Sequence, residues 1–150
     1  MNAWSLFKRV RRPAKEGKLK IAEGVFRELA AKTDPLYRII SKWDKQFGIV
    51  TNIYGDPQAS QVLAYIQQKY GDFIQVERRK YPGFFKSKRG RRSADSQVVA
   101  LAKQYGWIVV SDDQSVQLVC YLESIAHITW TQWAVRLQMG AQPNQLAFLS

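Results

Sequence analysis

Short apolar segments alternate with helical patterns along this 150-residue chain, and this alternation constrains the fold more than any other feature. Residues 107–110 (WIVV) are apolar at every position, as expected of a strand that is buried on both faces. Strands are predicted at 18–22, 49–53, 107–111 and 127–130, with an ambiguous segment at 73–77. Strands separated by helices form parallel βαβ units, so the pattern predicts an α/β fold with a mainly parallel sheet.

The helices between these strands are marked by apolar spacing and by turn residues. The clearest one follows Asp56 as its N-cap, has Pro57 in its first turn and is expected to stop at Gly71. A short helix over 3–11 is expected to be broken by Pro13 and Gly17. Further helices are predicted at 24–32, 35–47, 94–105, 114–125 and 131–139.

The composition indicates one folded domain over residues 1–150. Hydrophobic residues make up 46% of the chain, and Cys120 is the only cysteine, so no internal disulfide can form. Residues 141–150 are expected to be a loosely ordered tail. The sequence has neither the apolar core of a signal peptide nor an apolar run of about 20 residues, so we expect a cytoplasmic protein without a membrane segment.

The positive charge of the chain, +11 in total, is unevenly distributed. Residues 78–92 contain eight Lys or Arg and no acid, and residues 8–20 contain seven bases with one acid. Such surfaces attract polyanions, which favours RNA as a partner. The candidate RNA-binding residues are Arg78, Arg79, Lys88, Arg89, Arg91 and Arg92.

Aromatic residues lie within the first basic run and allow two interpretations. Tyr81, Phe84 and Phe85 can stack on unpaired bases, as aromatic side chains do in proteins that bind single strands. Alternatively, the run is a solvated loop and these rings anchor it to the core.

Two adjacent carboxylates, Asp112 and Asp113, follow the buried strand directly. A cap for the next helix is the simpler interpretation of this pair. Ligands of parallel sheets, however, bind at the carboxyl ends of the strands. Asp95 lies in the first turn of a helix, and Glu28 lies in another helix, both expected to start at this same edge. Converging carboxylates suit Mg²⁺ or Mn²⁺, which makes a metal site the sharper alternative.

Four segments together resemble the PIN-domain family, nucleases typified by VapC-like toxins. These are IAEGVFREL, ADSQVVALAKQYG, WIVVSDDQSV and ESIAHITW. The resemblance implies a three-layer α/β/α fold and a metal-dependent endoribonuclease that uses Mg²⁺ or Mn²⁺. It also implies a toxin neutralised by a cognate antitoxin protein; a homodimer is a further alternative.

The resemblance assigns roles to individual residues. Glu28, Asp95 and Asp113 correspond to the catalytic, metal-binding acids, and Asp113 keeps the family's Ser-x-Asp spacing. Asp112 would be a neighbouring charge or an alternative metal ligand. Ser111 would hydrogen-bond one of the carboxylates and orient it.

The chain departs from the family at its start. The family begins with a central strand that carries an Asp, whereas residues 1–8 resemble the family's next element and no Asp precedes Glu16. We therefore expect a sheet whose first, central strand is missing, with another segment or a partner in its place, and nuclease activity that is reduced or absent. The alternative functions are a non-catalytic nucleic-acid-binding or protein-interaction domain of the same fold and a nuclease that acts on DNA.

Overall fold

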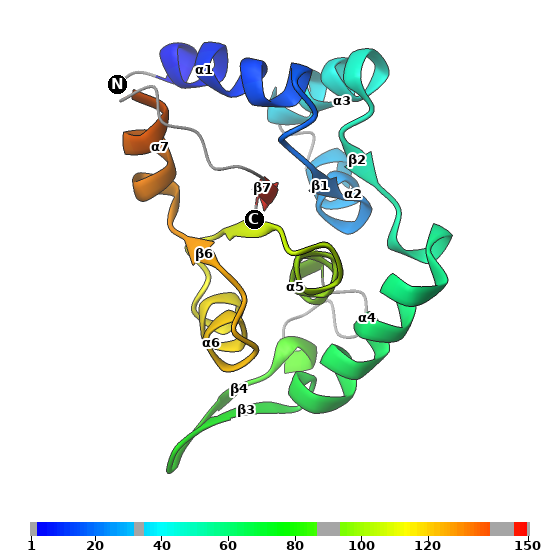
Figure 1. Cartoon of the computed structure of the whole chain (residues 1–150), viewed down its shortest axis with the longest axis vertical. Helices are drawn as coiled ribbons and strands as arrows, with labels where there is room; N and C mark the ends of the chain where they lie inside the picture. The colour runs from blue at the N-terminus through cyan, green and yellow to red at the C-terminus, as the bar shows by residue number, and fades with distance from the viewer. Residues whose placement is uncertain (1–2, 32–34, 87–93, 139–145, 150) are drawn as a thin grey trace.

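The computed structural model describes residues 3–31, 35–86, 94–138 and 146–149. They form a mixed α/β fold in which short strands pair mainly in parallel, as the alternation of elements predicted (Figure 1). The helices are α1 (Ala3–Lys15), α2 (Glu23–Ala31), α3 (Pro35–Phe47), α4 (Pro57–Tyr70), α5 (Ala94–Tyr105), α6 (Gln114–Leu122) and α7 (Trp130–Gln138), with the 3-10 helices η1 (Ile53–Gly55) and η2 (Phe84–Lys86).

The parallel strands form two groups. In the first group β1 (Ile21–Ala22) pairs with β2 (Val50–Thr51). In the second, β5 (Ile108–Val110) lies between β6 (His127–Ile128) and β7 (Leu146–Leu149) and is parallel to both. The crossovers between parallel strands are helical, which is the connection that such pairs require.

The strand β7 joins the two groups. It is hydrogen-bonded to β5 on one side and contacts β1 on the other, so it lies between them (Figure 1). Residues 146–149 belong to the segment expected to be a loosely ordered tail, and in the structure they form strand β7. Pairing with β5 satisfies backbone groups that would otherwise be exposed along this buried strand, which explains why the segment is ordered.

Two hydrophobic clusters lie on opposite faces of these strands. Val109 and Ala22 belong to a cluster with residues of α4, α5 and α6. Val110 and Ile21, their neighbours in the chain, belong to a second cluster with residues of α1, α3 and α7. Because successive residues of a strand point to opposite faces, the strands are covered by helices on both sides.

The ambiguous segment 73–77 and the start of the basic run form a β-hairpin. Strand β3 (Phe73–Val76) pairs antiparallel with β4 (Arg79–Pro82), and Figure 1 shows the hairpin projecting beyond α4 and α6. One interpretation of the basic run places residues 78–82 in a solvated loop, but Arg79–Pro82 form a strand instead. Ile74 is fully buried and fixes one face of the hairpin to the core.

The ends of two helices differ from expectation. Helix α1 continues through Pro13 to Lys15, because a proline in the last turn removes a single hydrogen bond and its ring is buried here. Helix α4 does end at Gly71, but this glycine keeps an ordinary φ of −68°. A Cβ at Gly71 would collide with the ring of Phe85, so close packing requires the glycine.

Candidate functional site

The two adjacent carboxylates after β5 each cap a helix. The Oδ1 of Asp113 accepts a hydrogen bond from the Val116 amide at 3.0 Å, which makes Asp113 the N-cap of α6. The Oδ1 of Asp112 accepts one from the Trp130 amide at 3.1 Å, at the first residue of α7. Carboxylates at these positions satisfy free N–H groups and interact favourably with the helix dipoles. A cap for the next helix is therefore confirmed for Asp113, whereas Asp112 binds the first amide of α7, a helix farther along the chain.

Ser111 lies at the end of β5 and is buried. Its Oγ accepts a hydrogen bond from the Asp113 amide at 3.0 Å and so orders the turn that leads into α6. A hydrogen bond from this hydroxyl to a carboxylate stays a prediction.

Helices α2 and α5, which carry Glu28 and Asp95, meet at their first turns. The Gly24 amide donates a buried hydrogen bond to Oε1 of Gln97 at 3.1 Å. A Cβ at Gly24 would come within 2.9 Å of that oxygen, so the glycine allows the close approach. Glu28 and Asp95 are both partly buried and both have interaction partners. The sequence signal that was overlooked is a polar Gln97 within the small, apolar face of α5.

These acids do not form a ready metal site. Among the residues that the structure describes, no three His, Cys, Asp or Glu side chains lie close enough together to hold a metal ion. One oxygen of Asp113 is already engaged by the α6 cap. The described residues therefore contain no preformed cluster of three such ligands for Mg²⁺ or Mn²⁺.

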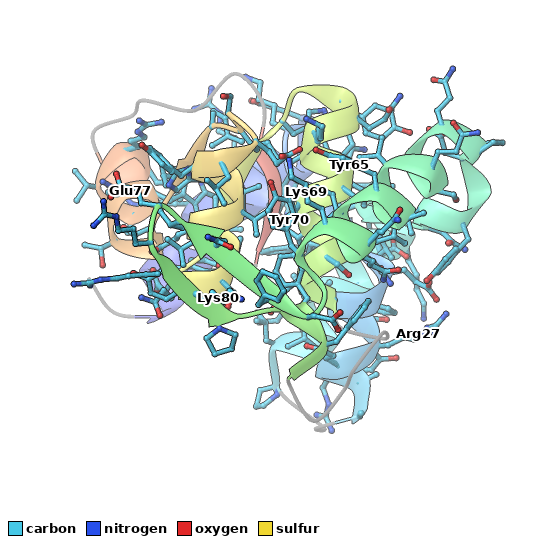
Figure 2. All side chains as sticks on the ribbon, turned by 90° about the horizontal axis from the view of Figure 1, so that it is seen from below. Arg27, Tyr65, Lys69, Tyr70, Glu77 and Lys80 are labelled. Atoms are coloured by element: carbon cyan, nitrogen blue, oxygen red, sulfur yellow. The ribbon has the colours of Figure 1, made fainter. Side chains whose placement is uncertain are left out.

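Basic side chains gather on the β3–β4 hairpin. Arg78, Arg79 and Lys80 are all exposed, and Figure 2 shows Lys80 on the hairpin with Glu77 at its tip. The other four candidate RNA-binding residues, Lys88, Arg89, Arg91 and Arg92, lie outside the described residues. Around the tip, a cavity of about 580 Å³ is lined by Val76, Glu77, Arg78, Arg79 and Tyr81.

The aromatic residues of the basic run are buried or partly buried against the hydrophobic core. Phe84 is only 3% exposed, while Tyr81 and Phe85 are partly buried. The anchoring interpretation is thus the better one, and stacking on Phe84 is excluded by its burial. The exposed aromatic of the hairpin is Phe73, which precedes the basic run and is 42% exposed. The Nζ of Lys80 lies 4.6 Å from the centroid of the Phe73 ring.

The second basic run, residues 8–20, lies mainly on α1. Arg9, Arg11, Arg12 and Lys15 are exposed there, and Val10 is buried. Helix α1 and the hairpin lie at opposite ends of the molecule (Figure 1). A short polyanion therefore cannot contact both basic surfaces at once.

A polar cluster that no sequence pattern singled out centres on Glu123, directly after α6. Its carboxylate accepts hydrogen bonds from the hydroxyls of Tyr70 at 2.5 Å and Tyr65 at 3.2 Å. It also forms ion pairs with Lys69 and Lys103, each at 3.2 Å. Figure 2 shows Tyr65, Lys69 and Tyr70 side by side on α4. The cluster therefore joins the end of α6 to α4 and α5.

The ionisation of this cluster reflects burial and hydrogen bonding together. Burial by itself raises the pKa of Glu123, but the four donors outweigh it and lower the pKa to about 2. Burial raises the pKa of Tyr70 to about 12, and its hydrogen bond to Glu123 adds to this shift. At neutral pH Glu123 is therefore a carboxylate and Tyr70 a neutral phenol.

No protein-family model, no curated protein and no solved structure matches the chain. The likeness to PIN domains therefore depends on the four quoted segments alone. Within the described ranges, no helix has the length and the apolar character needed to cross a membrane.

Proposed function

We propose that this chain binds RNA through the β3–β4 hairpin and the basic segment that follows it. The observation that carries the proposal is the row of three exposed cations, Arg78, Arg79 and Lys80, on a hairpin that projects from the domain. Exposed Lys and Arg side chains neutralise phosphates and release counterions, which is the main source of affinity for nucleic acids. The hairpin supplies these cations on a backbone that the buried Ile74 holds in place.

The framework that we propose is a three-layer, PIN-like α/β/α fold. The helices on both faces of the strands support it, as does the position of β7 between β5 and β1, where the family has its first strand. In this fold the hairpin is an addition beside α4 and α6 that offers a binding surface separate from the acidic edge.

The test compares two variants with the same loss of charge. In the hairpin variant, Arg78, Arg79 and Lys80 are changed to Gln, and binding to a fluorescein-labelled single-stranded RNA is measured by anisotropy over a range of salt concentrations. We expect affinity to fall about tenfold or more and the slope of log K against log salt to decrease by about 2, since each phosphate contact on a single strand contributes roughly 0.7.

The control variant changes Lys15, Lys42 and Lys45 to Gln. These lysines are also exposed, but they lie on α1 and α3, at the opposite end from the hairpin. We expect their loss to weaken binding only slightly. An equal loss of affinity in both variants would show that the RNA responds to net charge alone and would reject the hairpin as the binding surface.

Metal-dependent RNA cleavage at Glu28, Asp95 and Asp113 is the second candidate. The contact between the first turns of α2 and α5, through Gly24 and Gln97, favours it because it brings the helices of two of these acids together. A cognate antitoxin and a homodimer belong to this candidate as proposed partners.

A titration of Mn²⁺ with single-stranded RNA tests the second candidate. We expect Asp95→Asn and Asp113→Asn to abolish any Mn²⁺-dependent cleavage. Asn is as good an N-cap as Asp, so Asp113→Asn should leave the α6 cap and the stability of the domain intact. Cleavage that persists unchanged in both variants would reject the acidic edge as its site.

A further inference from the structure

The exposed face of the β3–β4 hairpin has the features of a stacking platform for an unpaired base. We infer that Phe73 stacks on a base of single-stranded RNA while Lys80 and the arginines beside it hold the flanking phosphates. This inference rests on the proposed RNA-binding function and adds to it the class of RNA and the residue that selects it.

The register of the hairpin sorts its residues onto two faces. Ile74 is paired with Tyr81 and Val76 with Arg79, and the apolar members of these pairs pack against the core. The other face carries Phe73, Gln75, Lys80 and Pro82, all of them exposed. Since a strand alternates with a period of two, the burial of Ile74 directs Phe73 to solvent and prevents it from turning inward.

The position of Phe73 suits stacking. Its ring is 42% exposed, lies at the start of a strand with a fixed backbone, and is next to the most basic part of the chain. An aromatic ring beside cations is the combination that binds single strands, because every base offers a π-face and every nucleotide brings a phosphate. In a duplex the bases are already stacked on each other, so no free base face is available to stack on the Phe73 ring.

Lys80 links the two parts of the interaction. Its ammonium lies 4.6 Å from the ring centroid, in a cation–π contact between diagonal positions of the two strands. The lysine side chain is flexible and exposed, so it can move from the ring to a phosphate when a base takes its place. Arg78, in the turn, and Arg79, which pairs with Val76 and is also exposed, add positive charge at the tip of the hairpin.

The test distinguishes the effect of the aromatic π-face of Phe73 from the effect of its apolar surface. Phe73→Leu keeps an apolar side chain without a π-face, and Phe73→Trp enlarges the π-face. A base stacked on an aromatic ring contributes about 1–3 kcal/mol, so we expect Phe73→Leu to weaken binding of single-stranded RNA by roughly 5- to 150-fold. Phe73→Trp should bind at least as tightly as the unchanged chain, and RNA should quench its added fluorescence.

Two controls accompany these variants. Tyr54→Leu removes an aromatic ring that is 61% exposed in η1, away from the hairpin, and should leave affinity unchanged. A blunt RNA duplex should bind the chain and its Phe73→Leu variant equally. Folding of each variant is checked by circular dichroism and thermal unfolding, since an exposed position should tolerate all of these changes.

The outcomes distinguish the inference from the function on which it rests. If Phe73→Leu binds single-stranded RNA as tightly as the unchanged chain while the triple Gln hairpin variant binds weakly, the hairpin is the RNA surface and the stacking platform is wrong. If the unchanged chain binds neither single-stranded nor duplex RNA, the proposed function itself is wrong and the platform falls with it.

Discussion

A single carboxylate, that of Glu123, connects three helices of this fold. Its side chain is only 5% exposed, and it receives donors from Tyr65, Lys69 and Tyr70 on α4 and from Lys103 on α5. A buried charge is costly unless it is paired and hydrogen-bonded, and both conditions are met here. The residue is therefore expected to matter for stability although it lies in a short turn.

We predict that Glu123→Gln destabilises the protein and removes part of its sensitivity to acid. The pKa of Glu123 is about 2 in the folded state and near 4.5 in the unfolded chain. Its contribution is thus complete above pH 4.5 and is lost as the pH falls from about 4.5 to 2. We expect a loss of about 3 kcal/mol at pH 7, because one pKa unit corresponds to about 1.4 kcal/mol, and urea unfolding across this pH range measures it.

Glu77→Gln is the matched control for this prediction, because Glu77 is exposed at the tip of the hairpin. It should change neither the free energy of unfolding at pH 7 nor the way in which this free energy falls as the pH decreases from about 4.5 to 2. If Glu123→Gln loses as much stability between pH 4.5 and 2 as the unchanged chain does, another group is responsible for the sensitivity to acid.

At the level of residues, the sequence predicted the parts of the site that depend on local spacing. The cap formed by Asp113 could be expected because it involves an amide three residues away. The contact from Asp112 to Trp130 spans 18 positions, and that from Tyr65 to Glu123 spans 58, so no local pattern reveals them. The exposure of Phe73 follows from the alternation of exposed and buried side chains along strand β3. The strand is too short for this alternation to be recognised in the sequence.

Among the elements, helices were easier to predict than short strands. Helix α4 begins after Asp56 with Pro57 in its first turn, as its capping residues indicated. Strands β1 and β2 have only two residues each, and β7 follows a polar segment, so their pairing depends on distant partners. Hydrophobic periodicity cannot report such pairing.

Helix α5 provides a test of backbone conformation at a helix end. Gly106 follows the helix with φ +70°, and a Cβ there would meet no atom within 4 Å. We predict that Gly106→Ala lowers the free energy of unfolding by about 1 kcal/mol, because an L-residue is strained in this region even where space is available.

Gly55→Ala is the control for that prediction. A Cβ at Gly55 also has open space, but the residue has no positive φ, so we expect a change within about 0.5 kcal/mol in thermal or urea unfolding. Equal losses in the two variants would mean that conformation is not the cause.

Strand β7 permits a test of an entire element. We predict that a chain ending at residue 145 is destabilised by several kcal/mol or aggregates, because its loss exposes the backbone of β5 on one side. Removal of Ser150 alone should leave stability unchanged. Size-exclusion chromatography and thermal unfolding of the two chains measure the difference; identical behaviour would show that β7 contributes nothing to the fold.

For the whole molecule, the charge of +11 predicts a dependence on salt. Positive charges repel one another in the compact state, and ionic strength screens this repulsion. The ion pairs at Glu16 and Glu23 involve exposed side chains, so their weakening by salt should cost little. We therefore predict that the melting temperature rises by a few degrees between low and moderate sodium chloride concentrations.

The Gln variant of Lys15, Lys42 and Lys45 checks the cause of this effect. With three fewer positive charges, it should melt at a higher temperature in low salt and respond less to added salt. A melting temperature that falls as salt increases would indicate that attractive ion pairs outweigh repulsion in this molecule.

The place of β7 in the sheet also has a consequence for synthesis of the protein. Its neighbours in space, β1 and β5, leave the ribosome earlier, and about 36 residues separate Val110 from Leu146. At roughly 5–20 residues per second, β5 waits for its partner for about 2–7 s. During that interval the nascent chain exposes the unpaired edge of β5 that β7 later covers, and it is then that chaperones would most influence its yield.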